Sequence, residues 1–204
     1  MNTKYLGDNL DLVKRVHFQV CTPYLHNLLV EPLITDSEQW TENALATYAT
    51  CLGILPNQVH REGEKRWRNT RRGKRAKWLE SLGSHYGDLF LDPDTGIDPS
   101  KKRGNRRHVP PDSVCALLDG CEGERIVMVY QHTPQRMGSE MQGLVRVARK
   151  RVKSVGDEEA GVYSLAVLGQ HATMLYFSKA PHRLAPIRAA FGWLGERVML
   201  IPCE

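Results

Sequence analysis

Apolar and polar residues follow one another along this chain in two different periods. Over residues 10–20, apolar side chains recur every three or four positions, which predicts an amphipathic helix. Over 28–30 and 125–131, apolar side chains form short continuous runs, which are typical of strands buried on both faces. The same two patterns predict further helices over 37–52, the second half of 60–80, 112–118, 137–155 and 182–194, and further strands over 88–92, 162–168, 173–177 and 198–201.

The order of these elements predicts the fold class. Strands and helices alternate along the chain, which indicates an α/β fold with a mainly parallel sheet flanked by helices. The strands 162–168 and 173–177 are separated only by a short turn, so we expect them to form a C-terminal antiparallel hairpin. The sequence shows no internal repeat and no linker-like segment, and residues 1–204 are therefore expected to form a single domain.

Composition narrows the class of protein. Hydrophobic residues make up 41% of the 204 residues and charged residues 25%, which excludes a mainly disordered or collagen-like chain. Charges at Asp8, Asp11 and Lys14 argue against a signal peptide. The longest uncharged run, 160–178, is broken by glycine and polar residues, so we expect no membrane segment. The five cysteines form no C-x-x-C pair and indicate reduced thiols in a cytoplasmic protein.

Positive charge is unevenly distributed along the chain. The net charge is only +5, but segments 61–77, 101–107 and 146–153 hold nine, five and five of the 28 lysines and arginines. Clusters of this kind neutralise phosphates, so the expected partner is nucleic acid, either DNA or RNA, with a protein partner as an alternative. The residues predicted to contact nucleic acid are Arg68, Arg71, Arg72, Lys74, Lys101, Lys102, Arg103, Arg106 and Arg107.

Acidic and imidazole side chains follow the predicted strands directly. Glu31 ends the first strand, Asp92 and Asp94 follow the second, and His132 follows the third. The carboxyl ends of neighbouring parallel strands meet at one end of a sheet, where ligands bind in such folds. We therefore predict a catalytic site in which Glu31, Asp92 and Asp94 hold Mg²⁺ and His132 acts as a base. In the alternative interpretation, the Asp-Pro-Asp-Thr-Gly sequence is a turn whose aspartates cap backbone N–H groups.

The spacing of the acidic residues resembles that of the Toprim domain. In this chain, as in that family, a strand ends in glutamate (Glu31) and a later strand ends in Asp-x-Asp (Asp92 and Asp94), with Gly96 nearby. The resemblance covers about residues 27–135. It implies Mg²⁺-dependent phosphodiester chemistry, as in the topoisomerases, primases and nucleases of that family.

A second resemblance is to Rossmann-like methyltransferases that modify amino groups in nucleic acid. Here Asp92-Pro93-Asp94-Thr95 stands where those enzymes carry Asp-Pro-Pro-Tyr after a strand. The segment Gly7–Lys14 is similar to the one that precedes the first strand of ribosomal-RNA adenine methyltransferases, and the C-terminal hairpin suits their antiparallel last strand. This resemblance implies S-adenosylmethionine as the cofactor.

Three functional hypotheses follow from these patterns. The first is a nuclease-like enzyme that acts on nucleic acid with Mg²⁺ and a basic substrate-binding surface. The second is a methyltransferase-like protein that uses S-adenosylmethionine on DNA or RNA. The third is an accessory factor without catalytic activity that binds nucleic acid or protein. The sequence leaves open whether the protein is an enzyme.

Overall fold

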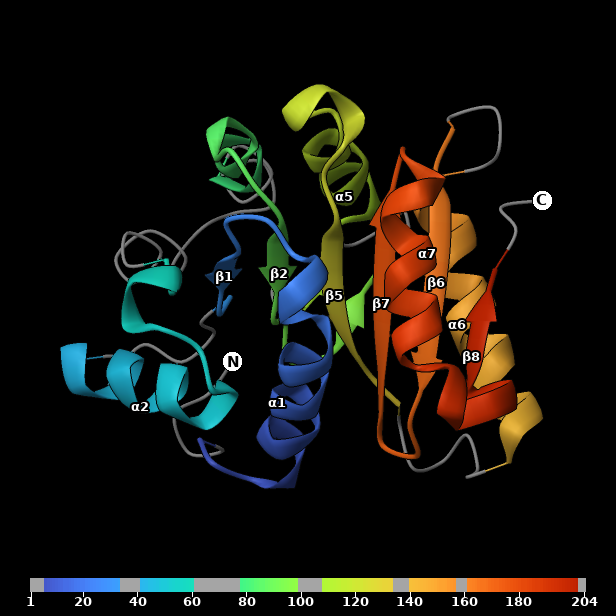
Figure 1. Cartoon of the computed structure of the whole chain (residues 1–204), viewed down its shortest axis with the longest axis horizontal. Helices are drawn as coiled ribbons and strands as arrows, with labels where there is room; N and C mark the ends of the chain where they lie inside the picture. Colours follow the sequence, from blue (N-terminus) through green and yellow to red (C-terminus); the bar gives the residue numbers. More distant parts are fainter. Residues whose placement is uncertain are drawn as a thin grey trace.

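The computed structural model describes residues 6–33, 41–60, 78–98, 108–133, 140–156 and 161–201, and its central feature is a six-stranded sheet with the strand order β1-β2-β5-β7-β6-β8 (Figure 1). The six strands are β1 (Leu29–Glu31), β2 (Leu89–Leu91), β5 (Val127–His132), β6 (Tyr163–Leu168), β7 (Ala172–Ser178) and β8 (Val198–Leu200). A separate small sheet joins β3 (Gly96–Ile97) to β4 (His108–Val109).

Strand direction confirms the predicted architecture. β1, β2 and β5 run parallel, whereas β7 is antiparallel to both β5 and β6, and β8 is antiparallel to β6. Four of the six strands therefore point the same way, and the predicted C-terminal hairpin is β6–β7. The hairpin folds back so that its second strand, β7, joins β5, and β8 forms the outer edge of the sheet.

Helices cover both faces of the sheet. One face carries α1 (Asn9–Cys21), α2 (Glu42–Leu52) and α7 (Pro181–Ala190), and the other carries α5 (Pro111–Leu118) and α6 (Met141–Val155) (Figure 1). Strand pleating divides the core between these faces, because neighbouring residues point in opposite directions. In β2, Leu89 and Leu91 pack on the α5–α6 side, whereas Phe90 packs on the α1–α2–α7 side.

Capping residues set the ends of the first two helices. The Asp8 carboxylate accepts hydrogen bonds from the backbone N–H groups at positions 10 and 11, so α1 begins one residue earlier than predicted. Thr41 caps α2 through the N–H of Ala44, and Gly53 ends it in the left-handed conformation, with φ 69°. The part of the predicted helix 37–52 that precedes residue 41 lies outside the described residues.

Most other elements agree with the sequence patterns within a few residues, but these patterns predict no strand at β3 or β4. α7 ends at Ala190, earlier than predicted, and continues as a 3-10 turn over Gly192–Arg197, which Gly195 interrupts with a positive φ of 58°. Of the helix predicted within 60–80, residues 78–80 are helical, and positions 61–77 lie outside the described residues. In the parts of the chain that the structure describes, no helix combines the length and apolarity needed to cross a membrane.

Candidate functional site

A buried ion pair lies at the carboxyl end of β2. The Lys14 ammonium of α1 is 2.8 Å from Asp92 Oδ2 and 3.0 Å from Asp11 Oδ1. The Tyr48 hydroxyl of α2 donates a hydrogen bond of 2.6 Å to the same Asp92 oxygen. Lys14 and Asp92 are only 3% and 1% exposed, so both charges are removed from water. The charge of Asp92, one of the predicted catalytic residues, is therefore neutralised by Lys14 from a helix that is distant in sequence.

The electrostatics of this pair keep Lys14 protonated. Burial alone would lower the pKa of the Lys14 ammonium, but the nearby Asp92 and Asp11 carboxylates outweigh that effect and raise the pKa above 10.5. Burial, and then the Asp92 charge, raise the pKa of the Tyr48 hydroxyl well above its ordinary value, so Tyr48 remains a hydrogen-bond donor. The result is a fixed arrangement of donors around one carboxylate oxygen.

Tyr130 also belongs to this cluster, through its ring and through its buried hydroxyl. The Lys14 ammonium lies 4.6 Å from the centre of the Tyr130 ring, a cation–π contact. Burial, followed by the charges of Asp92, Asp8 and Asp11, raises the pKa of the Tyr130 hydroxyl. Within the described part of the chain this buried hydroxyl has no hydrogen-bond partner. Buried hydroxyls are usually paired, so this one marks unused hydrogen-bonding capacity beside Asp92.

Glu31 is held by a different set of partners. Its carboxylate lies 2.7 Å from His60 Nδ1 and accepts a hydrogen bond of 3.3 Å from the Leu33 N–H. His60 stacks on Trp78, with ring centres 5.1 Å apart, in the core on the α5–α6 side of the sheet. Asp92 instead contacts α1 and α2. Glu31 and Asp92 thus end neighbouring strands but have separate partners.

The turn after Asp92 is fixed by Gln131 of β5. The Gln131 carbonyl oxygen accepts a hydrogen bond of 3.0 Å from the Ile97 N–H, and its amide donates one of 2.8 Å to the Thr95 carbonyl. Gly96 has a φ of 99°, and any side chain there would collide with Gln131. The half-buried Asp94 lies in this turn. Gln131 is thus a positioning residue that sequence reasoning missed.

The predicted base, His132, lies at the end of β5. Its pKa is lowered by burial and by the charge of His171, so the imidazole is neutral at physiological pH. His132 is paired in register with Ala172, the first residue of β7. The structure therefore places this residue at the expected end of the sheet.

These residues do not fit the Mg²⁺ site predicted from the sequence. Among the described residues, which include Glu31, Asp92 and Asp94, no group of three or more His, Cys, Asp or Glu side chains could hold a metal ion. Neighbouring carboxylates at this end of the sheet repel one another unless a positive charge lies between them. Lys14 supplies this positive charge to Asp92.

The turn after β1 likewise does not fit S-adenosylmethionine. The methyltransferases that the sequence resembles pass a glycine-rich loop beneath that cofactor, whereas this chain continues from Glu31 to Pro32 and Leu33. Leu33 is fully buried in the core and adopts a positive φ of 40°. A bulky buried side chain thus stands where a close backbone approach to the cofactor is required.

A second charged region covers the outer face of α6. Arg146, Arg149, Lys150 and Lys153 are exposed, and their spacing of three, one and three residues places them along one side of the helix. The opposite side of α6 packs into the core. The sequence of α6 contains no acidic residue. We call these four side chains the α6 basic stripe.

All nine residues predicted to contact nucleic acid lie outside the described residues. They are Arg68, Arg71, Arg72, Lys74, Lys101, Lys102, Arg103, Arg106 and Arg107. The described residues Asp98 and His108 flank the segment 99–107 in the sequence. The Asp98 N–H donates a hydrogen bond to the carbonyl of Val109. Asp98 also acts electrostatically on Arg151 of α6, where it opposes the lowering of the arginine pKa by burial. Asp98, which precedes this segment in the sequence, therefore lies close enough to α6 to act on Arg151.

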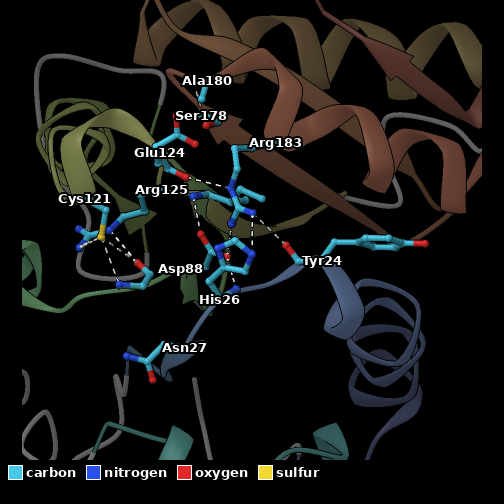
Figure 2. A network of polar contacts seen from close by, with 12 residues as sticks. Tyr24, His26, Asn27, Asp88, Cys121, Glu124, Arg125, Ser178, Ala180 and Arg183 are labelled. Atoms are coloured by element: carbon cyan, nitrogen blue, oxygen red, sulfur yellow. Dashed lines mark hydrogen bonds and ion pairs between the residues drawn. The ribbon is translucent and has the colours of Figure 1, made fainter.

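A polar network at the opposite end of the sheet holds neighbouring structural elements together (Figure 2). Asp88 accepts hydrogen bonds from the N–H groups of His26 and Ile126, each 2.7 Å long, and pairs with Arg183 at 2.8 Å. The buried Arg125 guanidinium donates to backbone carbonyls, including that of Gly87 at 2.8 Å. These contacts tie β2, β5 and α7 together.

Comparisons of the chain with protein-family models, with curated proteins and with solved structures find no match. Its geometry defines an α/β domain with a buried charged cluster at one end of the sheet and a basic helix on one face.

Proposed function

We propose that this protein binds nucleic acid through the α6 basic stripe. The observation that carries the proposal is the separation of the two sides of α6: one side is buried in the core, and the other presents four exposed cations and no carboxylate. A helix face that served only solubility would gain from mixed charges, because like charges on adjacent turns repel one another. The arrangement instead favours a polyanion, whose phosphates replace the missing acidic side chains.

The stripe has the sign of charge that binds a phosphate backbone. It extends over eight residues of helix, a rise of about 10 Å at about 1.5 Å per residue. If all four side chains neutralise phosphates, the logarithm of the binding constant falls with the logarithm of the salt concentration at a slope of about −3.6 for a duplex and about −2.8 for a single strand. Binding through the stripe is therefore expected to weaken strongly between low and physiological salt.

The test is a salt titration of binding to fluorescent DNA and RNA oligonucleotides, followed by anisotropy. The variant R146Q/R149Q/K150Q/K153Q removes the stripe, and we expect it to lose about three units of salt slope. The matched control is R188Q/R197Q, which removes two exposed arginines from the α7 side and its following turn. Equal salt slopes for wild type and the stripe variant would overturn the proposal.

Catalysis at Asp92 is the second candidate function, and the unused hydroxyl of Tyr130 beside that carboxylate favours it. An unpaired buried polar group calls for an explanation, and a catalytic role is one of the known ones. Strand nicking, measured with and without added Mg²⁺ or Mn²⁺, is the activity to assay. It should disappear in Asp92→Asn while nucleic-acid binding persists. An activity that survives this substitution contradicts catalysis at Asp92.

A further inference from the structure

A hollow of about 360 Å³ lies beside the α6 basic stripe. Among the described residues, its lining comes from the first half of α6: Met141, Gln142, Val145, Arg146 and Arg149. The two arginines also belong to the stripe, so the hollow and the charged surface share a rim. The volume lies within the range of about 300–1,000 Å³ found for small-molecule sites.

The lining combines two kinds of chemistry. Met141 and Val145 are half-buried and provide an apolar floor, whereas Gln142, Arg146 and Arg149 are exposed and provide polar groups at the rim. A guanidinium is planar and stacks on flat rings, and a glutamine amide both donates and accepts hydrogen bonds. A flat heterocycle with polar edges is complementary to such a lining.

We propose that the hollow takes one unpaired nucleobase of the bound strand while the α6 basic stripe holds the adjoining phosphates. The inference rests on the proposed function and names its substrate class, a nucleic acid with an accessible single-stranded nucleotide. Charge complementarity selects this occupant, because the rim of the hollow is cationic and continues into Lys150 and Lys153. A base inside a duplex is stacked and paired, so only an unpaired or extruded base can enter.

The experiment compares two single strands with identical phosphate backbones. One is an oligothymidine, and the other carries abasic sugars at the internal positions, so that only the bases differ. We expect the full protein to bind the oligothymidine about fivefold or more tightly, the effect of stacking one base. A duplex of equal length provides the arm in which every base is paired, so filling the hollow should leave the affinity for the duplex unchanged.

A variant that fills the hollow localises the effect. Val145→Trp should abolish the preference for the oligothymidine over the abasic strand and leave the salt slope unchanged. The matched control is Val16→Trp, at a valine of α1 that is 46% exposed, and it should keep the preference. Gln142→Ala is a milder second variant at an exposed position, and it should reduce the same preference.

The outcomes separate the two proposals. Equal affinity of the wild-type protein for the oligothymidine and the abasic strand overturns the nucleobase site and leaves the proposed function standing. Absence of salt-dependent binding to all three nucleic acids overturns both. Binding of polyglutamate that is tighter than that of the oligothymidine, and that Val145→Trp abolishes, would identify an acidic peptide as the occupant and also overturn the nucleobase site.

Discussion

Two buried aspartates flank β2, one at each end, and their carboxylates make different sets of contacts. Asp88 accepts hydrogen bonds on both carboxylate oxygens, two of them from backbone N–H groups, and also pairs with Arg183. Asp92 receives Lys14 and Tyr48 on a single oxygen and lies near Tyr130, whose hydroxyl has no hydrogen-bond partner among the described residues. Equal burial therefore does not imply equal contacts: Asp88 joins structural elements through both carboxylate oxygens, whereas Lys14 and Tyr48 both contact the same oxygen of Asp92.

The largest expected effect is that of Asp88→Ala. The substitution removes the carboxylate partner of the partly buried Arg183 and leaves two backbone N–H groups without their acceptor, so the free energy of unfolding should fall by about 4 kcal/mol. Urea denaturation at neutral pH measures it. A loss below about 1 kcal/mol would show that the contacts of Asp88 contribute little to stability, and it would contradict the structural role assigned to Asp88.

Lys14→Met should produce the next largest effect. It leaves the Asp92 and Asp11 carboxylates buried without a counter-charge, and we expect a loss of about 3 kcal/mol. The double variant Lys14→Met/Asp92→Asn should recover part of this loss, because one of the uncompensated charges is then absent. Strictly additive losses in the two single variants would contradict a direct coupling between Lys14 and Asp92.

The Lys14 pair also predicts a dependence on alkaline pH. The folded-state pKa of Lys14 is raised above 10.5, so its contribution to stability is fully present below that pH and is lost as the pH rises through the folded-state pKa. The difference in stability between wild type and Lys14→Met should therefore be constant from pH 7 to about 10 and should shrink at higher pH. Denaturation of both proteins along one pH series provides the measurement, and a difference that grows above pH 10 would have the wrong sign.

Two tyrosines offer a smaller, matched test at the Asp92 end. Tyr48→Phe removes a hydrogen bond to a buried carboxylate and should destabilise the fold by about 2 kcal/mol. Tyr130→Phe removes a buried hydroxyl that has no partner in the described part of the chain, so it should be neutral or stabilising by about 1 kcal/mol. Thermal unfolding of the two variants side by side decides the matter. Equal destabilisation would mean that the Tyr130 hydroxyl is satisfied in solution.

The smallest effect is expected at an exposed ion pair. Lys179 and Asp119 also contact each other, but the Asp119 side chain is 65% exposed. Asp119→Ala should change the free energy of unfolding by about 0.5 kcal/mol or less, because exposed ion pairs contribute little. This variant gives the reference value for an exposed ion pair. A loss as large as that of Asp88→Ala would show that burial does not determine how much an ion pair contributes to stability.

Local patterns were sufficient for most of the fold. The continuous apolar runs around Phe90 and Met128 predicted buried strands, and the spacing of apolar residues before Cys21 predicted α1. Both signals lie within a few adjacent residues, so no long-range information is needed. The position of Asp92 and His132 after their strands followed from the same local reasoning.

The partners of the candidate residues could not be predicted in the same way. Lys14 is 78 residues from Asp92 in sequence, and His60 is 29 residues from Glu31. Nothing local to a lysine or a histidine indicates which distant carboxylate it will contact. The one available signal was the spacing of Asp11 and Lys14, which places both on one side of α1 and makes that side charged. The basic face of α6, in contrast, follows directly from its helical periodicity.

The placement of β7 between β5 and β6 has a consequence for the order of folding. The β6–β7 hairpin needs only a short turn, whereas β1 and β2 are parallel neighbours separated by more than fifty residues of chain. Closing a long loop costs more conformational entropy than closing a short one, so the hairpin should form early and β1 should join the sheet late. Lys14 belongs to α1, which also packs against β7, but Tyr48 belongs to α2, in the segment between β1 and β2. The charged cluster around Asp92 is therefore expected to assemble last and, when the protein is destabilised, to open first.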